Sequence, residues 1–113
     1  MTKKLTLEDI ILAYKETGLK PRLHRPDVEN GACCPVGVLA IFYGKLSPFY
    51  INTNFLYEYC DSEYGVNFIN ALWKGFDGWE FNESITDVDY HDGYRLGRQV
   101  REYYQRLGVL EIW

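Results

Sequence analysis

The sequence predicts a mostly α-helical fold, a compact bundle of four to five helices around one buried helix at about residues 35–43. Apolar residues recur at intervals of three and four along several segments, which is the period of an α-helix. Residues that favour helix starts and helix ends, chiefly Thr, Pro and Gly, frame those segments. The 113 residues are 47% hydrophobic and 25% charged, near the average for globular proteins. We therefore expect one globular domain over residues 1–113.

The first helix is predicted at residues 7–17. Thr6 is a favoured N-cap, and two acidic residues follow in the first turn, where the positive end of the helix dipole stabilises them. Gly18 suits the left-handed backbone conformation that often ends a helix. Two prolines and no apolar period mark residues 18–32, so this stretch is expected to be an irregular loop.

The central helix is expected at residues 35–43. Pro35 suits the first helical position, because the N–H that proline lacks would be unpaired there. Gly44 is a stop signal, and the residues between the two are apolar on every face. A helix without a polar face needs neighbours on several sides, so we expect this helix to be the most buried.

Three further helices complete the predicted bundle. They are expected at about residues 49–59, at residues 66–74 and from about Asp89 to Leu107. Before the last helix, Asp77 and Gly78 stand between aromatic residues, a pattern typical of a hairpin turn. The sequence therefore allows a small β-hairpin near residues 76–85.

The net charge of −4 is unevenly distributed, because residues 44–92 carry nine acidic and two basic residues. Direct nucleic-acid binding is not expected, since it needs clustered positive charge. The longest apolar run, residues 36–43, is too short to span a membrane. Lys3 and Lys4 precede a stretch that is too polar for a secretory signal. We expect a cytoplasmic protein that does not associate with membranes.

The cysteines form a poor disulfide framework, because they are odd in number and two are adjacent: Cys33, Cys34 and Cys60. Reduced thiols are expected. Cys34 directly precedes the central helix, and the positive end of a helix lowers a thiol pKa. With His24 or His91 as a base, Cys34 is the candidate nucleophile of a small thiol-dependent enzyme. The interpretation that we favour is that the thiols are inert core residues.

No residues have the spacing of a metal site. The chain lacks C-x-x-C and H-x-x-x-H pairs. The acidic stretch that starts at Asp87 differs from a calcium loop, because its sixth residue is Asp92 and its twelfth is Arg98. Nucleotide-binding and hydrolase motifs are also lacking. We expect neither a metal nor a cofactor.

Gly93 and Gly97 stand four residues apart within the predicted last helix. A glycine inside a helix costs up to about 1 kcal/mol relative to alanine, so a closely packed neighbour should compensate. We favour a neighbour within the chain. The alternative is a homodimer that forms through Gly93 and Gly97.

The leading functional hypothesis is a non-enzymatic protein-interaction or regulatory domain with a protein partner. Ten Tyr, six Phe and three Trp are too many for a domain of this size to bury. Tyr, Trp and Arg often anchor interfaces. The expected contact residues lie in the turn at 76–81 and on the last helix: Phe76, Asp77, Trp79, Phe81, Arg95, Arg98 and Arg101. Alternatively, the turn aromatics fold back over the core. The competing functions are the thiol enzyme and a phage-type acidic inhibitor that imitates nucleic acid.

Overall fold

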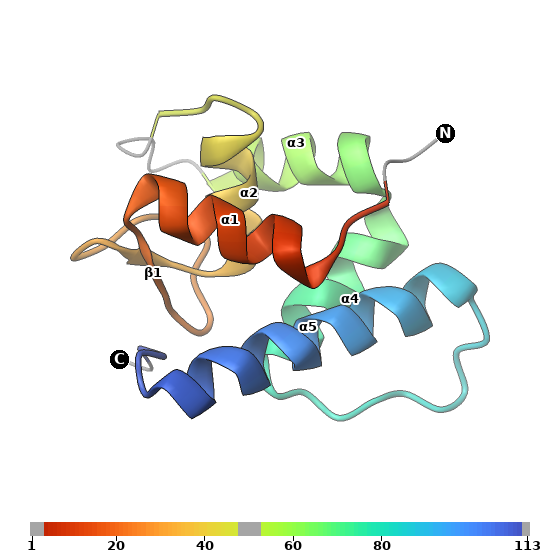
Figure 1. Ribbon diagram of the computed structural model, residues 1–113. Coiled ribbons are helices and arrows are strands. Elements are labelled where there is room, and N and C mark those ends of the chain that lie inside the picture. The colour runs from red at the N-terminus through yellow and green to blue at the C-terminus, as the bar shows by residue number, and fades with distance from the viewer. Residues whose placement is uncertain (1–3, 48–52, 112–113) are drawn as a thin grey trace.

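The computed structural model describes residues 4–47 and 53–111. In chain order the elements are α1 (Leu7–Thr17), β1 (Lys20–Pro21), β2 (Ala32–Cys33), α2 (Pro35–Phe42), α3 (Thr53–Tyr64), α4 (Val66–Asp77) and α5 (Val88–Leu107) (Figure 1). The described residues thus form five helices and one small sheet, which confirms the mostly α-helical fold class. The start predicted for the third helix, at residue 49, lies outside the described residues.

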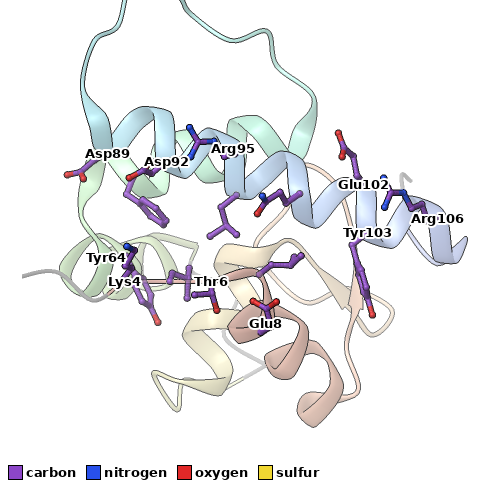
Figure 2. Close-up of a pocket in the computed structure, with 15 residues that line it drawn as sticks. Lys4, Thr6, Glu8, Tyr64, Asp89, Asp92, Arg95, Glu102, Tyr103 and Arg106 are labelled. Carbon is purple, nitrogen blue, oxygen red and sulfur yellow. Dashed lines mark ion pairs between the residues drawn. The ribbon is translucent and has the colours of Figure 1, made fainter.

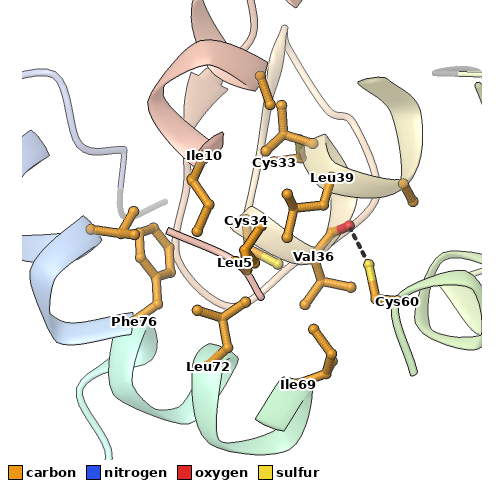
Figure 3. Close-up of a cluster of buried hydrophobic side chains, with 14 of the residues drawn as sticks. Leu5, Ile10, Cys33, Cys34, Val36, Leu39, Cys60, Ile69, Leu72 and Phe76 are labelled. Atoms are coloured by element: carbon orange, nitrogen blue, oxygen red, sulfur yellow. Dashed lines mark hydrogen bonds between the residues drawn. The ribbon is translucent and has the colours of Figure 1, made fainter. Parts of the chain in front are cut away.

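The helix α2 lies at the centre of the bundle, as its apolar sequence predicts. Its residues 35–40 are all buried, and α1, α3 and α4 contact it. Figure 3 shows Val36 and Leu39 of α2 among Ile10 of α1 and Leu72 of α4. A helix that is apolar all round is stable in water only when neighbouring elements cover every side.

Local capping sets the ends of α1 and the start of α5. The Asp9 N–H donates to the Thr6 hydroxyl (3.3 Å), and the Thr6 N–H donates to the Asp9 carboxylate (2.9 Å), which forms a capping box. Gly18 ends α1 with a left-handed φ of 72°. Asp87 caps α5 by accepting a hydrogen bond from the Asp89 N–H (2.8 Å).

The helices α4 and α5 pack closely and run in the same direction. A Cβ at Gly93 would overlap the Phe68 carbonyl, and a Cβ at Gly97 would overlap the Leu72 carbonyl. Residue numbers therefore rise together along both helices. The prediction of a close neighbour within the chain is confirmed. The homodimer through Gly93 and Gly97 is wrong, because α4 of the same chain covers both glycines.

Residues 78–87 run back along the helix pair and are called the return segment. This path is required because α4 and α5 are parallel, so the end of α4 lies far from the start of α5 (Figure 1). The segment is anchored by α5: Tyr90 accepts a hydrogen bond from the Asn82 N–H (3.1 Å), and Tyr94 donates to the Trp79 carbonyl.

The small sheet does not lie near residues 76–85, where the sequence allows a hairpin. Phe76 and Asp77 complete the last turn of α4, and the return segment bonds to α5 side chains. The observed strands, β1 and β2, pair in parallel with Lys20 opposite Ala32. A single bridge adds Glu111 beside β1, through hydrogen bonds with Pro21 and Leu23 of 2.9 Å each.

Candidate functional site

The end of α4 presents an exposed tryptophan that contacts the last turns of the helix. Gly78 ends the helix with a φ of 89°, which turns the chain back over its last turn. The Trp79 N–H then donates to the Lys74 carbonyl (3.0 Å), and the Trp79 ring lies edge-on to Trp73 with 5.8 Å between centroids. The Trp79 residue is nevertheless 54% exposed.

A lysine completes this surface, which we call the tryptophan patch: Trp73, Lys74 and Trp79. The Lys74 ammonium lies 5.7 Å from the Trp73 centroid and 6.0 Å from the Trp79 centroid. At these distances a cation is attracted to an aromatic face. The Trp73 indole donates to the Asn70 side chain (3.4 Å). The Trp79 indole N–H has no hydrogen-bond partner within the described ranges, so it is available to an acceptor from outside.

The other residues predicted at this turn do not join the patch. Phe76 is fully buried in the core beside Leu72 (Figure 3). Phe81 is half-buried and packs between Tyr90 and Tyr94, with centroids 5.5 and 5.1 Å away. Of the three aromatic residues predicted as contacts, only Trp79 is exposed. Phe76 packs in the core, and Phe81 packs against α5.

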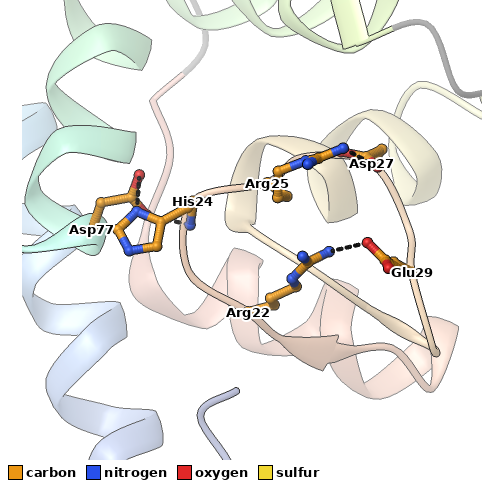
Figure 4. A network of polar contacts seen from close by, with 6 residues as sticks. All are labelled: Arg22, His24, Arg25, Asp27, Glu29 and Asp77. Atoms are coloured by element: carbon orange, nitrogen blue, oxygen red, sulfur yellow. Dashed lines mark hydrogen bonds and ion pairs between the residues drawn. The ribbon is translucent and has the colours of Figure 1, made fainter. Parts of the chain in front are cut away.

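Asp77 holds a distant loop instead of facing a partner. Its side chain is 6% exposed and accepts a hydrogen bond from the His24 N–H (2.9 Å), while His24 Nδ1 lies 3.6 Å from the second carboxylate oxygen (Figure 4). Burial raises the pKa of Asp77, and the hydrogen bond from His24 opposes this rise. His24 has a left-handed φ of 74°, which is uncommon for a residue other than glycine.

Ion pairs order the rest of this loop, as Figure 4 shows. The Arg22 guanidinium is buried and lies 3.2 Å from the Glu29 carboxylate. Arg25 lies 3.0 Å from Asp27 and is exposed. These pairs were not expected from the sequence, where the loop has no periodic pattern. The alternation of opposite charges two and seven residues apart is the one signal that could have indicated them.

The three arginines predicted on α5 do not form one face. Arg101 donates to the Phe76 carbonyl (3.0 Å) and so caps the end of α4. Arg98 lines a hollow of about 870 Å³ beside the return segment, where it lies among acidic side chains such as Glu80 and Glu83. Arg95 lines a separate groove and lies 3.7 Å from Asp92.

The thiol of Cys34 is buried and its pKa is raised, whereas a reactive thiol is accessible and its pKa is lowered. Cys34 is only 2% exposed, and burial raises its pKa to about 12, although the N–H groups of Gly37 and Val36 oppose this rise. The helix N-terminus therefore acts as expected from the sequence, but desolvation outweighs it. A thiol enzyme would need Cys34 exposed in a cleft beside a histidine, and the structure does not meet this condition.

The other candidate groups for thiol chemistry are also engaged. The Cys60 thiol is buried and donates to the Val36 carbonyl (3.4 Å; Figure 3), and burial raises the pKa values of Cys33 and Cys60. His24 contacts Asp77, and His91 Nε2 lies 2.8 Å from the Ile85 carbonyl of the return segment.

A groove of about 820 Å³ lies between the start of α1 and α5 (Figure 2). Its floor is apolar, with Leu5, Tyr64 and Leu96 buried, and its walls carry charged side chains. Sequence reasoning identified only Arg95 among its lining residues. Other lining residues lie on α5 beside Arg95, and the rest come from residues 4–8, Tyr64 and Phe68, which no local pattern would have joined to α5.

Within residues 4–47 and 53–111, no group of three or more His, Cys, Asp or Glu side chains is placed to hold a metal ion. No helix in the same part of the chain is long and apolar enough to cross a membrane.

These features describe a mostly helical fold with two distinct surface features, the tryptophan patch and the α1–α5 groove. Comparison with protein-family models, with curated proteins and with solved structures finds no match for this chain.

Proposed function

We propose that this chain is a non-enzymatic interaction domain that binds a protein partner through the tryptophan patch. The observation that supports the proposal is the exposure of Trp79 beside Trp73 and Lys74. Tryptophan is among the residues that most often anchor protein interfaces. A partner that covers the exposed indole gains the hydrophobic free energy of that surface.

Preorganisation favours binding at this position. The backbone bond to Lys74 and the ring contact with Trp73 already hold Trp79 in place. Little side-chain freedom is therefore lost when a partner binds, and this loss is a main cost of association. The indole N–H of Trp79 and the Lys74 ammonium add donors at the edge of an apolar surface. A partner with an apolar pocket and a nearby carboxylate or carbonyl group fits this arrangement.

The experiment that tests the proposal is affinity capture from a lysate of the native host with the Trp79→Ala variant. We expect this variant to lose a partner that the wild type captures, while its free energy of unfolding falls by less than about 2 kcal/mol, because the residue is half-exposed. Phe76→Ala should instead lower the free energy of unfolding by about 3–5 kcal/mol, because the side chain is fully buried.

The matched control is Phe55→Ala, which truncates an aromatic residue of α3 that is 47% exposed and lies outside the patch. This variant should capture the same proteins as the wild type. The proposal fails if Trp79→Ala is as stable as the wild type and captures the same set of proteins.

A further inference from the structure

The loop between β1 and β2 contains an asparagine that is followed directly by a glycine. Asn30 and Gly31 form the tip of a tight turn, in which the backbones of Glu29 and Ala32 exchange two hydrogen bonds of 3.0 Å each. Both tip residues have a left-handed φ, 52° for Asn30 and 74° for Gly31. Asparagine and glycine adopt this conformation more readily than other residues, so the pair favours the turn.

The turn leaves the amide of Asn30 and the backbone nitrogen of Gly31 accessible. Both residues are exposed. Neither the Asn30 side chain nor the Gly31 N–H forms a hydrogen bond with another described residue. A Cβ at Gly31 would meet no atom within 4 Å. The Gly31 nitrogen can therefore reach the amide carbon of Asn30 through a local rearrangement of an exposed turn, and no packed side chain has to move.

The other asparagines differ from Asn30 in their neighbours. Asn30 is the one asparagine of the sequence that precedes a glycine, and a side chain at that next position hinders attack by the backbone nitrogen. Asn82 is also exposed, but its side-chain oxygen accepts hydrogen bonds from the Ser84 N–H (3.1 Å) and hydroxyl (2.6 Å). Asn67 lies within α4, and its side chain donates to the Asp87 carboxylate (2.6 Å).

We propose that Asn30 is a site of spontaneous deamidation in the folded protein. Asparagine is among the chemically labile residues of proteins. The Gly31 nitrogen loses its proton to the solvent and forms a bond to Cγ of Asn30. The bond between Cγ and the amide nitrogen breaks, and that nitrogen takes up a proton and leaves as ammonia. The product is a succinimide ring that joins the two residues.

Water then opens the succinimide at one of its two carbonyl carbons. Attack at the side-chain carbonyl gives aspartate, and attack at the main-chain carbonyl gives isoaspartate. The complete reaction consumes one water molecule and releases one ammonia molecule, so it needs neither an enzyme nor a redox partner.

The two products should affect the loop differently. In isoaspartate the chain runs through the side-chain carbon, which lengthens the backbone of the turn. This change displaces the Gly31 carbonyl, which accepts a hydrogen bond from the Lys20 N–H (2.8 Å), and the bonded pair of Glu29 and Ala32. Aspartate leaves the backbone unchanged. Both products place a new carboxylate next to Glu29, which lies 3.2 Å from the buried Arg22 guanidinium (Figure 4).

The test is incubation of the folded protein at mildly alkaline pH, with peptide mapping by mass spectrometry at intervals. The same chain unfolded in urea gives the reference rate. We expect the folded protein to convert at Asn30 within the period in which the unfolded chain converts. Asn67 and Asn82 of the folded protein are internal controls and should keep their amides. Gly31→Ala should lose the modification at Asn30, because a methyl group hinders the attacking nitrogen.

Hydrogen exchange measures the effect on the turn. The isoaspartate form, isolated by chromatography from the incubated protein, should exchange the Lys20 amide hydrogen faster than the fresh protein does, because its acceptor has moved. The matched control is Asn30→Asp, which has the new charge but an unaltered backbone and should keep the wild-type exchange rate. Equal rates in the isoaspartate form and in Asn30→Asp would contradict the predicted displacement.

Two results would overturn the proposal itself. If the folded protein keeps the amide of Asn30 while the unfolded chain loses it, the turn protects the residue. If Asn82 is modified as fast as Asn30, the glycine and the exposed turn confer no selectivity. The proposal is independent of the tryptophan patch, because the loop contains no residue of the patch, and Trp79→Ala should be modified at the wild-type rate.

Discussion

At the scale of single residues, burial decides the chemistry of the cysteines. All three thiols lie in the core, and Cys34 is within the positive end of α2. The loss of solvation disfavours a thiolate more than the helix N-terminus favours it, so the pKa rises instead of falling. The same residue in the same sequence position would be reactive if the helix entry faced solvent.

This burial predicts a pH dependence of stability. The pKa of Cys34 rises from about 9 in the unfolded chain to about 12 in the folded one, so the unfolded state loses its proton first. The stabilisation is complete below pH 9 and is lost as the pH rises toward 12. Urea denaturation at a series of pH values should show this decline, and Cys34→Ala should reduce its slope.

Thiol labelling provides an independent check. Iodoacetamide should modify the cysteines of the native protein slowly and those of the unfolded chain quickly, because the folded thiols are neutral and buried. Rapid labelling of native Cys34 below neutral pH would contradict the burial and would favour the enzyme hypothesis.

At the scale of elements, the short distance between α4 and α5 depends on glycines, which have no side chain. Gly93 and Gly97 of α5 lie against α4 carbonyls, and Gly75 of α4 lies against the Tyr94 carbonyl. Each glycine weakens its own helix, but together they let two backbones approach closely. The helix pair is therefore stabilised by packing rather than by helix propensity.

Gly97→Leu should disrupt this pair. A side chain at this position meets the backbone of Leu72 and Phe76, so overpacking should lower the free energy of unfolding by at least about 1–3 kcal/mol. A thermal melt and size-exclusion chromatography would measure the change and the molecular mass. Gln105→Leu, at an exposed position of the same helix, should change stability by less than about 0.5 kcal/mol. An unaltered melting temperature in Gly97→Leu would contradict the close packing.

The burial of α2 makes a second prediction at this scale. Leu39→Ala removes a fully buried side chain and should lower the free energy of unfolding by about 2–5 kcal/mol. Leu12→Ala, the same substitution at a residue of α1 that is 44% exposed, should cost less than about 1 kcal/mol. Chemical denaturation compares the two, and similar losses would show that α2 is not the core helix.

At the scale of the whole molecule, contacts between distant segments join the irregular loop to the helices. Asp77 at the end of α4 holds His24, and Glu111 near the end of the chain pairs beside β1. These contacts place the loop between β1 and β2 against the bundle. They also leave the tryptophan patch and the groove open on surfaces that different elements form.

The Asp77 contact predicts a difference between two substitutions. Asp77→Asn keeps an oxygen for the His24 N–H, whereas Asp77→Ala removes it. We expect Asp77→Ala to lower stability by about 1 kcal/mol and to accelerate amide hydrogen exchange at His24, while Asp77→Asn retains the wild-type exchange rate.

The ionisation of Asp77 predicts how the stability of Asp77→Asn compares with that of the wild type at neutral pH. Its pKa is raised in the folded state, so the stabilisation from the protonated carboxyl is complete below pH 3.8 and is lost as the pH rises through the folded pKa. At neutral pH, Asp77→Asn should therefore be at least as stable as the wild type. A loss of stability equal to that of Asp77→Ala would contradict this interpretation.

The existence of the helices and the caps of α1 and α2 followed from local patterns, because apolar periodicity and the conformations of Thr6, Gly18 and Pro35 act over a few residues. Two predicted helix ends, at residues 59 and 74, were wrong, because α3 continues to Tyr64 and α4 to Asp77, where packing outweighs the local stop signals. The central position of α2 followed in the same way, since an apolar segment must be covered. The compensation for Gly93 and Gly97 by a close neighbour was also evident from the cost of glycine within a helix.

Other features depended on contacts between residues far apart in the chain. The parallel pairing of β1 and β2, the path of the return segment and the α1–α5 groove require surfaces from several elements. Whether Cys34 is reactive, and whether Phe76 or Trp79 faces solvent, depends on the low dielectric and coverage that such contacts create. Local sequence encodes backbone preference and apolar pattern, but exposure and pKa arise only after the elements have packed.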